Sequence, residues 1–450
     1  MTLSRRTFFA LTAGALLAQD KTGMNVLSRR PEDLEMPLSG FSDYLTPIEH
    51  FFVRTHVYVP TVDLPSWRLT VDGEVATPLT LSMEELKKLP STDLVSVVEC
   101  AGNGRGFADP PVPGLQWTNG SVGNALWRGV RLADVLQRAG IKGSAREVLF
   151  NGADVPISTM QDFRRTVTVK KSLDPNTLLA YEMNGVPLPV KHGFPLRVVA
   201  PGWASDSWVK WLTNITVLDK EFDGFWMKNA YRKPDHPIAP GSAMAPEKMV
   251  PVTSLRVKSV ISTPLDGAFL KLGDALVVAG VAWSGDKGPI TSVDVSTDGG
   301  RSWKPATLDQ RKTQFGWRPW SFSFRPDRES YYNVMARATD ASGDSQPFAQ
   351  EWNPSGYGWN AVQRVGVNVA ENPEKPVISV GGGRSIPPDA TFKDTCLTCH
   401  EEDVIAQQRL TRAQWDREIT KMTNWGAPVK PETRDSILNY LVQAFGPRPR

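Results

Sequence analysis

The stretch Ser96-Val-Val-Glu-Cys100-Ala-Gly-Asn-Gly-Arg105-Gly106 places a single cysteine between an apolar run and a glycine-rich segment. The apolar run from Leu94 to Val98 predicts a buried strand, and the glycines that follow predict a turn. The thiol of Cys100 is therefore expected at the end of a strand, where a soft thiolate is a natural ligand for a redox metal. The alternative is that Cys100 is a core residue, as most lone cysteines are.

The composition is that of a folded globular protein. The chain has 450 residues, of which 40% are hydrophobic and 22% are charged, and this length allows two to four domains. The net charge of +3 gives no indication of nucleic-acid binding. Three cysteines are present, and an odd number does not form a disulfide framework.

The first residues are typical of a twin-arginine export signal. Residues 1–19 contain the pair Arg5-Arg6, followed by a modest apolar stretch over residues 7–18. That stretch is shorter than the roughly 20 apolar residues needed to span a bilayer, and we expect no membrane span in the mature protein. The sequence therefore predicts a periplasmic protein that is exported folded by the twin-arginine route, which suits a protein loaded with a complex cofactor.

A second motif lies near the end of the chain. Cys396-Leu-Thr-Cys399-His400 has the spacing of a haem attachment site, in which each thiol adds to one vinyl group and the imidazole binds the iron. A thioredoxin-like pair is the alternative, although such motifs do not end in histidine. Met422 is the only methionine after His400, and we expect it to be the second axial ligand of a haem c, although its helical position also allows core packing.

Between these motifs the pattern predicts two larger domains. Residues 45–250 mix short strands and short helices, which predicts an α+β domain. Residues 253–369 alternate apolar and polar positions over seven or so strands, and Asp298-Gly299-Gly300 marks a hairpin, which predicts an immunoglobulin-like β-sandwich. A flexible linker over residues 370–392 then leads to a small all-α cytochrome c domain over residues 393–450.

Local signals place individual elements. A capping box at Ser82 and Glu85 predicts one helix start, and Thr411 with Gln414 predicts another. A helix over residues 132–139 is expected to stop at Gly140. A final helix is expected over residues 432–445, and strands are expected over residues 67–71, 94–98, 196–200 and 214–218.

Several blocks of the first domain, in this order along the chain, carry a family resemblance. These are Phe52-Val-Arg54-Thr-His56, Cys100-Ala-Gly-Asn-x-Arg105, the long block from Leu178 to Gly202, and Val209-Lys210-Trp211-Leu212. With them the chain resembles the sulfite oxidase family of molybdenum enzymes. The resemblance covers about residues 45–365, and it includes the β-sandwich, which resembles that family's dimerisation domain.

The resemblance implies roles for individual residues. It implies that Cys100 ligates molybdenum and that the residues that hold molybdopterin are Phe52, Val53, Arg54, Thr55, His56, Asp154, His192, Arg197, Trp208, Val209 and Lys210. It further implies that the residues of a catalytic anion pocket are Arg54, Arg105, Trp117, Tyr231 and Arg318. Arginine forks bind small oxyanions bidentately and keep their charge. Gly104 stands where sulfite oxidases often carry another arginine, which weakens the expected positive charge near the metal.

The motifs together predict a periplasmic sulfite dehydrogenase that contains molybdenum-molybdopterin and haem c. Sulfite would be oxidised to sulfate, and the electrons would pass singly through the haem to an external cytochrome c. The resemblance also implies a homodimer. Three alternatives stay open: a sulfane dehydrogenase of a thiosulfate-oxidising complex that acts on protein-bound sulfur, a nitrate or sulfoxide reductase, and an electron carrier whose first domain has lost its metal.

Overall fold

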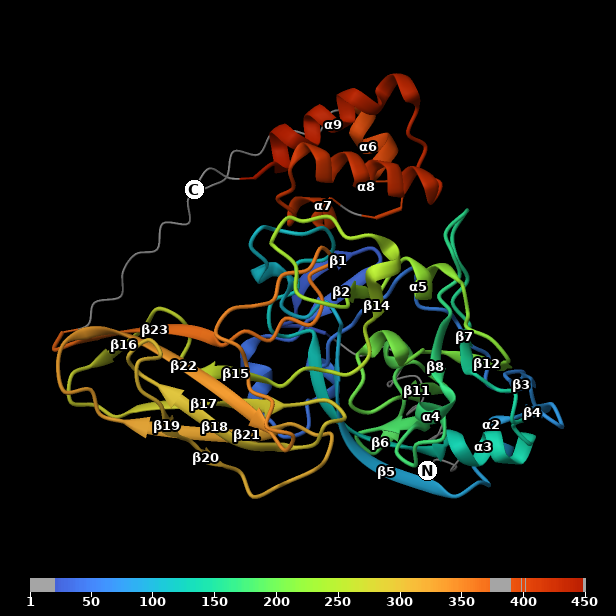
Figure 1. The fold of residues 1–450 in the computed structure, drawn as a ribbon, viewed down its shortest axis with the longest axis horizontal. Helices are drawn as coiled ribbons and strands as arrows, with labels where there is room; N and C mark the ends of the chain where they lie inside the picture. Colours follow the sequence, from blue (N-terminus) through green and yellow to red (C-terminus); the bar gives the residue numbers. More distant parts are fainter. Residues whose placement is uncertain (1–20, 373–389, 398, 401, 448–450) are drawn as a thin grey trace, which may run out of the picture.

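The computed structural model describes residues 21–372, 390–397, 399–400 and 402–447. The predicted export signal and most of the predicted linker lie outside these residues, as does Thr398 of the predicted haem motif. A mixed α/β part comes first, a β-sandwich follows, and a helical module lies over the first part (Figure 1). Within the described ranges, no helix has both the length and the apolar character that a membrane span needs.

The first part is built on a hairpin and two five-stranded sheets. The hairpin strands are β1 (Asn25–Arg29) and β2 (Glu32–Glu35). One sheet has the order β10-β9-β6-β5, with β11 paired to β9, and its strands are β5 (Ser91–Glu99), β6 (Val122–Arg131), β9 (Leu178–Met183), β10 (Val186–Pro187) and β11 (Arg197–Val199). The other has the order β4-β3-β12-β7-β8, and its strands are β3 (Leu69–Gly73), β4 (Leu79–Leu81), β7 (Glu147–Gly152), β8 (Arg165–Thr168) and β12 (Leu212–Leu218).

Short helices and a second hairpin complete the first part. The α-helices are α2 (Met83–Leu86), α3 (Leu132–Ala139), α4 (Val169–Ser172) and α5 (Phe225–Lys228), and the hairpin strands are β13 (Arg232–Pro234) and β14 (Met249–Pro251). The 3-10 helices are η1 (Leu38–Ser42), η2 (Ile48–His50), η3 (Arg105–Phe107), η4 (Val190–His192), η5 (Ser205–Ser207) and η6 (Pro246–Lys248).

The local signals of the sequence are confirmed. The α3 helix has the predicted bounds and ends at Gly140, whose φ of 71° is the left-handed conformation that glycine adopts without cost. Ser82 and Glu85 form the predicted capping box at the start of α2. The four predicted strands are present as β3, β5, β11 and β12, with ends that differ by up to three residues.

The predicted β-sandwich is confirmed as two sheets around one core. One sheet contains β15 (Lys258–Thr263), β17 (Leu276–Trp283), β20 (Thr307–Leu308) and β21 (Arg318–Phe324). The other contains β16 (Ala268–Lys271), β18 (Ile290–Ser296), β19 (Lys304–Pro305), β22 (Ser330–Asp340) and β23 (Gln363–Ala370). Alternate residues of both sheets, such as Val278 and Val334, are fully buried between them.

The helical module consists of α6 (Ala390–Cys396), α7 (Asp403–Ala406), α8 (Arg412–Asn424) and α9 (Pro431–Phe445). The α6 helix begins inside the predicted linker range, because Phe392 is completely buried in the helical core. Thr411 and Gln414 form the predicted capping box of α8. The final helix was expected from residue 432, and it begins one residue earlier, at a proline.

The module contacts the first part through hydrogen bonds, aromatic rings and an ion pair of 3.6 Å between Arg29 and Asp403. The side-chain oxygen of Gln407 accepts a hydrogen bond of 2.7 Å from the backbone N–H of Gln116. The ring of Trp425 packs against the rings of Phe225 and Trp226, with centroids 5.6 and 6.0 Å apart. The module therefore covers the loops of the first part that Figure 1 shows beneath α7 and α8.

Candidate functional site

A cavity in the first part gathers residues that are far apart in the sequence. Its walls come from the segment before β3, the end of β5, and the segments on both sides of β11. Of the residues predicted to hold the cofactor, those that line it are Phe52, Arg54, Thr55, His56, Cys100, Asp154, His192, Arg197, Trp208 and Lys210. The other two, Val53 and Val209, are buried in the adjoining hydrophobic cores.

Two of these side chains are buried cations. The guanidinium of Arg197 donates to the backbone oxygens of His192 (2.9 Å) and Trp208 (3.3 Å), and burial lowers its pKa to about 9. The ammonium of Lys210 donates to the backbone oxygens of Arg54 and Lys191, at 2.9 and 3.0 Å. Burial and the charge of Arg197 lower the pKa of Lys210 to about 7. Neither side chain has an ion-pair partner among the described residues.

The structure adds Lys21 to this group, although nothing in the sequence singled it out. Its ammonium donates to the backbone oxygens of Phe51 (2.8 Å) and Ile48, and it lies 3.1 Å from Nε2 of His192. Burial, followed by the charge of Lys191, lowers the pKa of Lys21 to about 7. A lone lysine carries no motif, so only the fold reveals this contact.

Arg54 is held by an acidic partner that the sequence also does not indicate. Asp33, in β2, forms an ion pair of 3.2 Å with Arg54 and accepts a 2.9 Å hydrogen bond from the backbone N–H of Thr55. Burial raises the pKa of Asp33 to about 6, against the opposing effect of the Arg54 charge. The hairpin of β1 and β2 thus fixes the arginine at the edge of the cavity.

A second acidic residue in the cavity wall, Asp206, forms an ion pair with Arg165, and both side chains are almost fully buried. Burial raises the pKa of Asp206 to about 6, and the charge of Arg165 counteracts part of that rise. Sequence reasoning missed this pair, as well as six further lining residues: Phe51, Val98, Phe163, Lys191, Ser205 and Trp211. Of these, Lys191 and Trp211 belong to blocks already quoted for the family, which was the available signal.

Cys100 lies just beyond the end of β5, as predicted, and its thiol lines the cavity. Its backbone N–H donates to the carbonyl oxygen of Ser121 at 2.9 Å. Burial raises the pKa of the thiol, while a hydrogen bond from the Gly102 N–H and the charge of Arg54 lower it. A metal bound here would take the thiol as a thiolate, since coordination removes the proton.

Tyr231 and His56 form a neutral pair beside the thiol. The Tyr231 hydroxyl lies 2.7 Å from Nε2 of His56. Burial raises the pKa of Tyr231, so its hydroxyl is protonated, and burial with the charge of Arg54 lowers the pKa of His56 well below its usual value. Tyr231 has a φ of 53°, a left-handed conformation that costs energy in a bulky residue and is found at functional sites.

Three residues predicted for the anion pocket do not line this cavity. Arg105 donates to the backbone oxygens of Ser355 (2.9 Å) and Leu115 (3.1 Å). Trp117 is buried in the hydrophobic core around Cys100. Arg318 lies in β21 of the sandwich, where its guanidinium donates to backbone oxygens at 3.0 Å. The resemblance implied these positions, and their roles in an anion pocket stay predictions, although the charge of Arg105 acts on the thiol of Cys100.

Gly104 has a physical reason to be glycine. Its φ is 90°, and a Cβ added there would lie 2.5 Å from the side chain of Trp359. A second arginine at this position is therefore excluded by Trp359, a residue of the segment that follows the sandwich strand β22. No arginine is present at position 104 to add positive charge. Of the arginines predicted for the anion pocket, Arg54, Arg105 and Arg318, only Arg54 lines the cavity.

The residues predicted to bind haem lie on the helical module. Cys396 ends α6 and packs partly against the helical core, while the Cys399 side chain is exposed. His400 and Met422 are half-buried, and Met422 lies in α8. Two thiols and an imidazole in one module are the groups that attach and ligate a haem c. The haem itself stays a prediction.

The chemistry of the cavity fits one kind of ligand. Buried cations without counter-ions favour an anion, because charge-assisted hydrogen bonds then compensate the cost of burial. A buried thiol in the same wall favours a soft metal. The cavity therefore fits the class of protein that binds an anionic cofactor carrying both a phosphate and a metal, of which molybdopterin is one.

Comparisons with known proteins agree with this class. Residues 56–226 match the family described as "Oxidoreductase molybdopterin binding domain", and residues 250–370 match "Mo-co oxidoreductase dimerisation domain". Sulfite oxidase of Gallus gallus is 35% identical over 349 residues, which cover 74% of this chain and 75% of that protein. The chain belongs to the sulfite oxidase family of molybdopterin-binding oxidoreductases.

Two further relatives show how far the similarity extends. The mitochondrial sulfite oxidase of Drosophila melanogaster is 36% identical over 361 residues, which cover 76% of this chain. The chain spans 62% of the length of that protein, somewhat less than two thirds. A crystal structure of the sulfane dehydrogenase SoxCD from Paracoccus pantotrophus is similar with a TM-score of 0.65 and 27% identity, and the match covers 80% of this chain and 90% of that one.

Proposed function

We propose that this protein is a molybdenum-dependent sulfite dehydrogenase of the periplasm. It passes electrons one at a time through a haem c on its helical module to an external cytochrome c. The observation that carries the proposal is the cavity, in which buried cations without counter-ions, a buried thiol and a protonated tyrosine meet.

Different residues of the cavity bind the phosphate and the metal of the cofactor. When bound, the molybdenum cofactor supplies the two-electron redox change and the transfer of an oxygen atom. Arg197 and Lys210 bind its phosphate, and the negative charge keeps both side chains protonated. Cys100 binds the metal as a thiolate. Arg197 and Lys210 form no ion pair among the described residues, so both are available to an anion.

The substrate is oriented by Arg54 and Tyr231. Asp33 fixes one side of the Arg54 guanidinium, and the fork attracts a sulfite oxygen. The protonated Tyr231 hydroxyl donates its one hydrogen to the same anion, which requires the neutral His56 to be the tautomer whose Nε2–H donates to the tyrosine oxygen. Oxidation of sulfite with water yields sulfate, two protons and two electrons, so two single-electron transfers must follow each turnover.

The position of the helical module supports a route by which electrons leave the cavity one at a time. It rests on the first part beside the cavity, since Trp425 packs on Trp226 and the Trp226 ring contacts that of His56 at 4.9 Å between centroids. A haem held by Cys396, Cys399, His400 and Met422 accepts one electron at a time and passes it outward. The proposed location rests on the export signal predicted over residues 1–19.

A homodimer is part of the proposal. The sandwich matches a dimerisation domain, and two of its strands expose large apolar side chains, Val277 at 51% and Tyr331 at 61%. These side chains lie in different sheets and form no single patch, so the match to a dimerisation domain is what supports a second copy as the partner.

The test is a visible spectrum of the exported, oxidised protein before and after sulfite is added without oxygen. Reduced haem bands should form promptly, and Cys100→Ser should abolish them while dithionite still reduces its haem. This substitution removes the thiolate that would bind the metal, but it leaves the helical module unchanged. A wild-type haem that dithionite reduces and sulfite does not would contradict sulfite as the substrate.

A second candidate is the oxidation of sulfur bound to a carrier protein. The similarity to the sulfane dehydrogenase SoxCD favours it, as does the presence of Arg54 without Arg105 in the cavity wall, which weakens the attraction of a free dianion. Haem reduction by a sulfur-loaded carrier but not by sulfite would select it. Electron flow from reduced haem to nitrate or a sulfoxide would select a reductase, and absence of molybdenum in the exported protein would select an electron carrier.

A further inference from the structure

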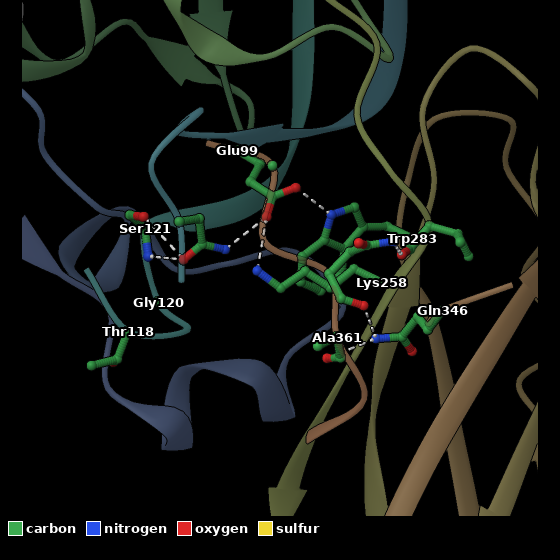
Figure 2. Close-up of polar contacts among 12 residues, drawn as sticks. Glu99, Thr118, Gly120, Ser121, Lys258, Trp283, Gln346 and Ala361 are labelled. Atoms are coloured by element: carbon green, nitrogen blue, oxygen red, sulfur yellow. Dashed lines mark hydrogen bonds and ion pairs between the residues drawn. The ribbon is translucent and has the colours of Figure 1, made fainter. Parts of the chain in front are cut away.

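The residue before the thiol, Glu99, is the centre of a buried polar cluster. Its carboxylate accepts hydrogen bonds from Lys258 Nζ (3.1 Å), Trp283 Nε1 (2.8 Å) and Asn103 Nδ2 (2.8 Å). The side chain of Glu99 is 8% exposed and that of Lys258 is 3% exposed. Figure 2 shows the carboxylate of Glu99 pointing between Lys258 and Trp283. We call Glu99, Asn103, Lys258 and Trp283 the Glu99 node.

The Glu99 node joins two parts of the chain. Glu99 is the last residue of β5, whereas Lys258 begins β15 and Trp283 ends β17 of the sandwich. Lys258 and Trp283 are paired in the register of these two strands, so the sheet itself fixes their distance. Two donors from the sandwich thus converge on the residue next to Cys100.

The node also holds the turn that carries the thiol. Asn103 donates its backbone N–H to the carbonyl oxygen of Cys100 at 2.9 Å. Its side-chain oxygen accepts a 3.0 Å hydrogen bond from the hydroxyl of Ser121. The N–H of Gly358, which lies between the sandwich strands β22 and β23, donates to the carbonyl oxygen of Ala101 at 2.9 Å. The turn is therefore tied on both sides to groups that lie outside it.

A buried ion pair is a weak source of stability, because desolvation offsets the attraction of the charges. Well-packed apolar side chains of similar volume would join the two parts as firmly. What the carboxylate adds is direction, since three donors on one group specify its position more narrowly than apolar contacts do.

We propose that the Glu99 node is a positioning site, through which the sandwich sets the direction of the Cys100 thiol toward the cofactor. The proposal rests on the proposed role of Cys100 as the metal ligand. Glu99 and Asn103 belong to the first part, whereas Lys258 and Trp283 belong to the sandwich. The sandwich therefore contributes to the reaction as well as to assembly.

Two tryptophans allow a matched test. Trp283→Phe removes the indole N–H that binds Glu99. Trp317→Phe is the control, because Trp317 is equally buried in the same hydrophobic core and its Nε1 has no hydrogen-bond partner among the described residues. In the full protein, Trp283→Phe should keep the molybdenum content and the KM for sulfite, lower kcat about tenfold, and shift the thiolate-to-metal absorption band. Trp317→Phe should change none of these.

A second measurement does not need a loaded enzyme. In the full chain prepared without cofactor, alkylation of Cys100 by iodoacetamide is followed by peptide mass analysis. Trp283→Phe should accelerate this alkylation several-fold relative to Trp317→Phe, because the thiol-bearing turn becomes less constrained. Equal alkylation rates, together with an unshifted absorption band, would overturn the role of the Glu99 node.

These outcomes separate the node from the function. If the wild-type protein binds no molybdenum, the proposed function fails, and the alkylation rates still decide whether the node holds the turn. If Cys100→Ser loses the absorption band while Trp283→Phe and Trp317→Phe behave alike, the metal ligand stands and the positioning role is rejected.

Discussion

Cys100 lies between two regions that bury charge in opposite ways. On its cavity side, Arg197 and Lys210 form no ion pair among the described residues, and the pKa values of both are lowered, although the neighbouring Arg54 is paired with Asp33. On its sandwich side, Glu99 and Lys258 form a complete ion pair with further hydrogen bonds. Unpaired buried charge costs stability and is retained where a ligand supplies the counter-charge, whereas a paired charge is satisfied by the protein alone.

The largest expected effect comes from breaking the paired region. Lys258→Met leaves the Glu99 carboxylate buried without its cation, and we expect the free energy of unfolding to fall by about 3–5 kcal/mol. Arg197→Met in the cavity should change it by only about 1 kcal/mol, because lost hydrogen bonds are balanced by relief of charge burial. Urea denaturation of the cofactor-free protein, followed by tryptophan fluorescence, measures both.

The control for this prediction is the double variant Glu99→Gln with Lys258→Met. It removes both charges together and should recover much of the loss, since no uncompensated ion stays buried. Equal destabilisation by Lys258→Met and Arg197→Met would contradict the distinction between the two regions.

The sequence predicted those parts of the fold that local signals determine. The bounds of α3 follow from an apolar face that stops at Gly140, and the capping boxes at Ser82 and Thr411 need only four consecutive residues each. The pairing of β12 with β3 in parallel joins residues more than 140 positions apart. No local pattern specifies such a pair, because its stability comes from tertiary packing.

The site shows the same division. Short motifs placed Cys100, His56 and Lys210 in one cavity, because each lies in a block whose spacing is distinctive. Lys21 and Asp33 were missed, since a single charged residue outside a motif is usually a surface residue. Arg318 was placed in the anion pocket by resemblance, but its guanidinium is held by backbone oxygens within the sandwich.

The unpaired cation of the cavity should also make stability depend on pH. The pKa of Lys210 falls from its usual 10.5 to about 7 on folding, so between these pH values the unfolded chain binds a proton that the folded chain does not. Stability of the cofactor-free protein should therefore rise with pH over this window, by up to about 1.4 kcal/mol per pH unit for one such group. Lys210→Met should reduce this slope, and urea denaturation at several pH values between 7 and 10 measures it.

Two comparisons sharpen the pH result. Lys21, whose pKa is also lowered to about 7 by burial, acts in the same direction, so Lys210→Met reduces the slope without abolishing it. Lys88→Met removes an exposed lysine whose side chain is 69% accessible, and it is the control for loss of a charge. If Lys210→Met leaves the slope of stability against pH unaltered, the charge of Lys210 is already compensated by other groups of the cofactor-free protein.

The smallest expected effect tests the neutral link between the node and the thiol. Ser121→Ala removes the 3.0 Å hydrogen bond to Asn103, and a neutral hydrogen bond contributes about 1 kcal/mol to stability. Ser259→Ala is the matched control, because the buried Ser259 hydroxyl has no partner among the described residues and its loss should cost nothing. Thermal and urea unfolding measure both variants. If Ser121→Ala is as harmless as Ser259→Ala, the Ser121 hydroxyl adds nothing measurable, and the turn is held by Glu99 and the remaining backbone hydrogen bonds.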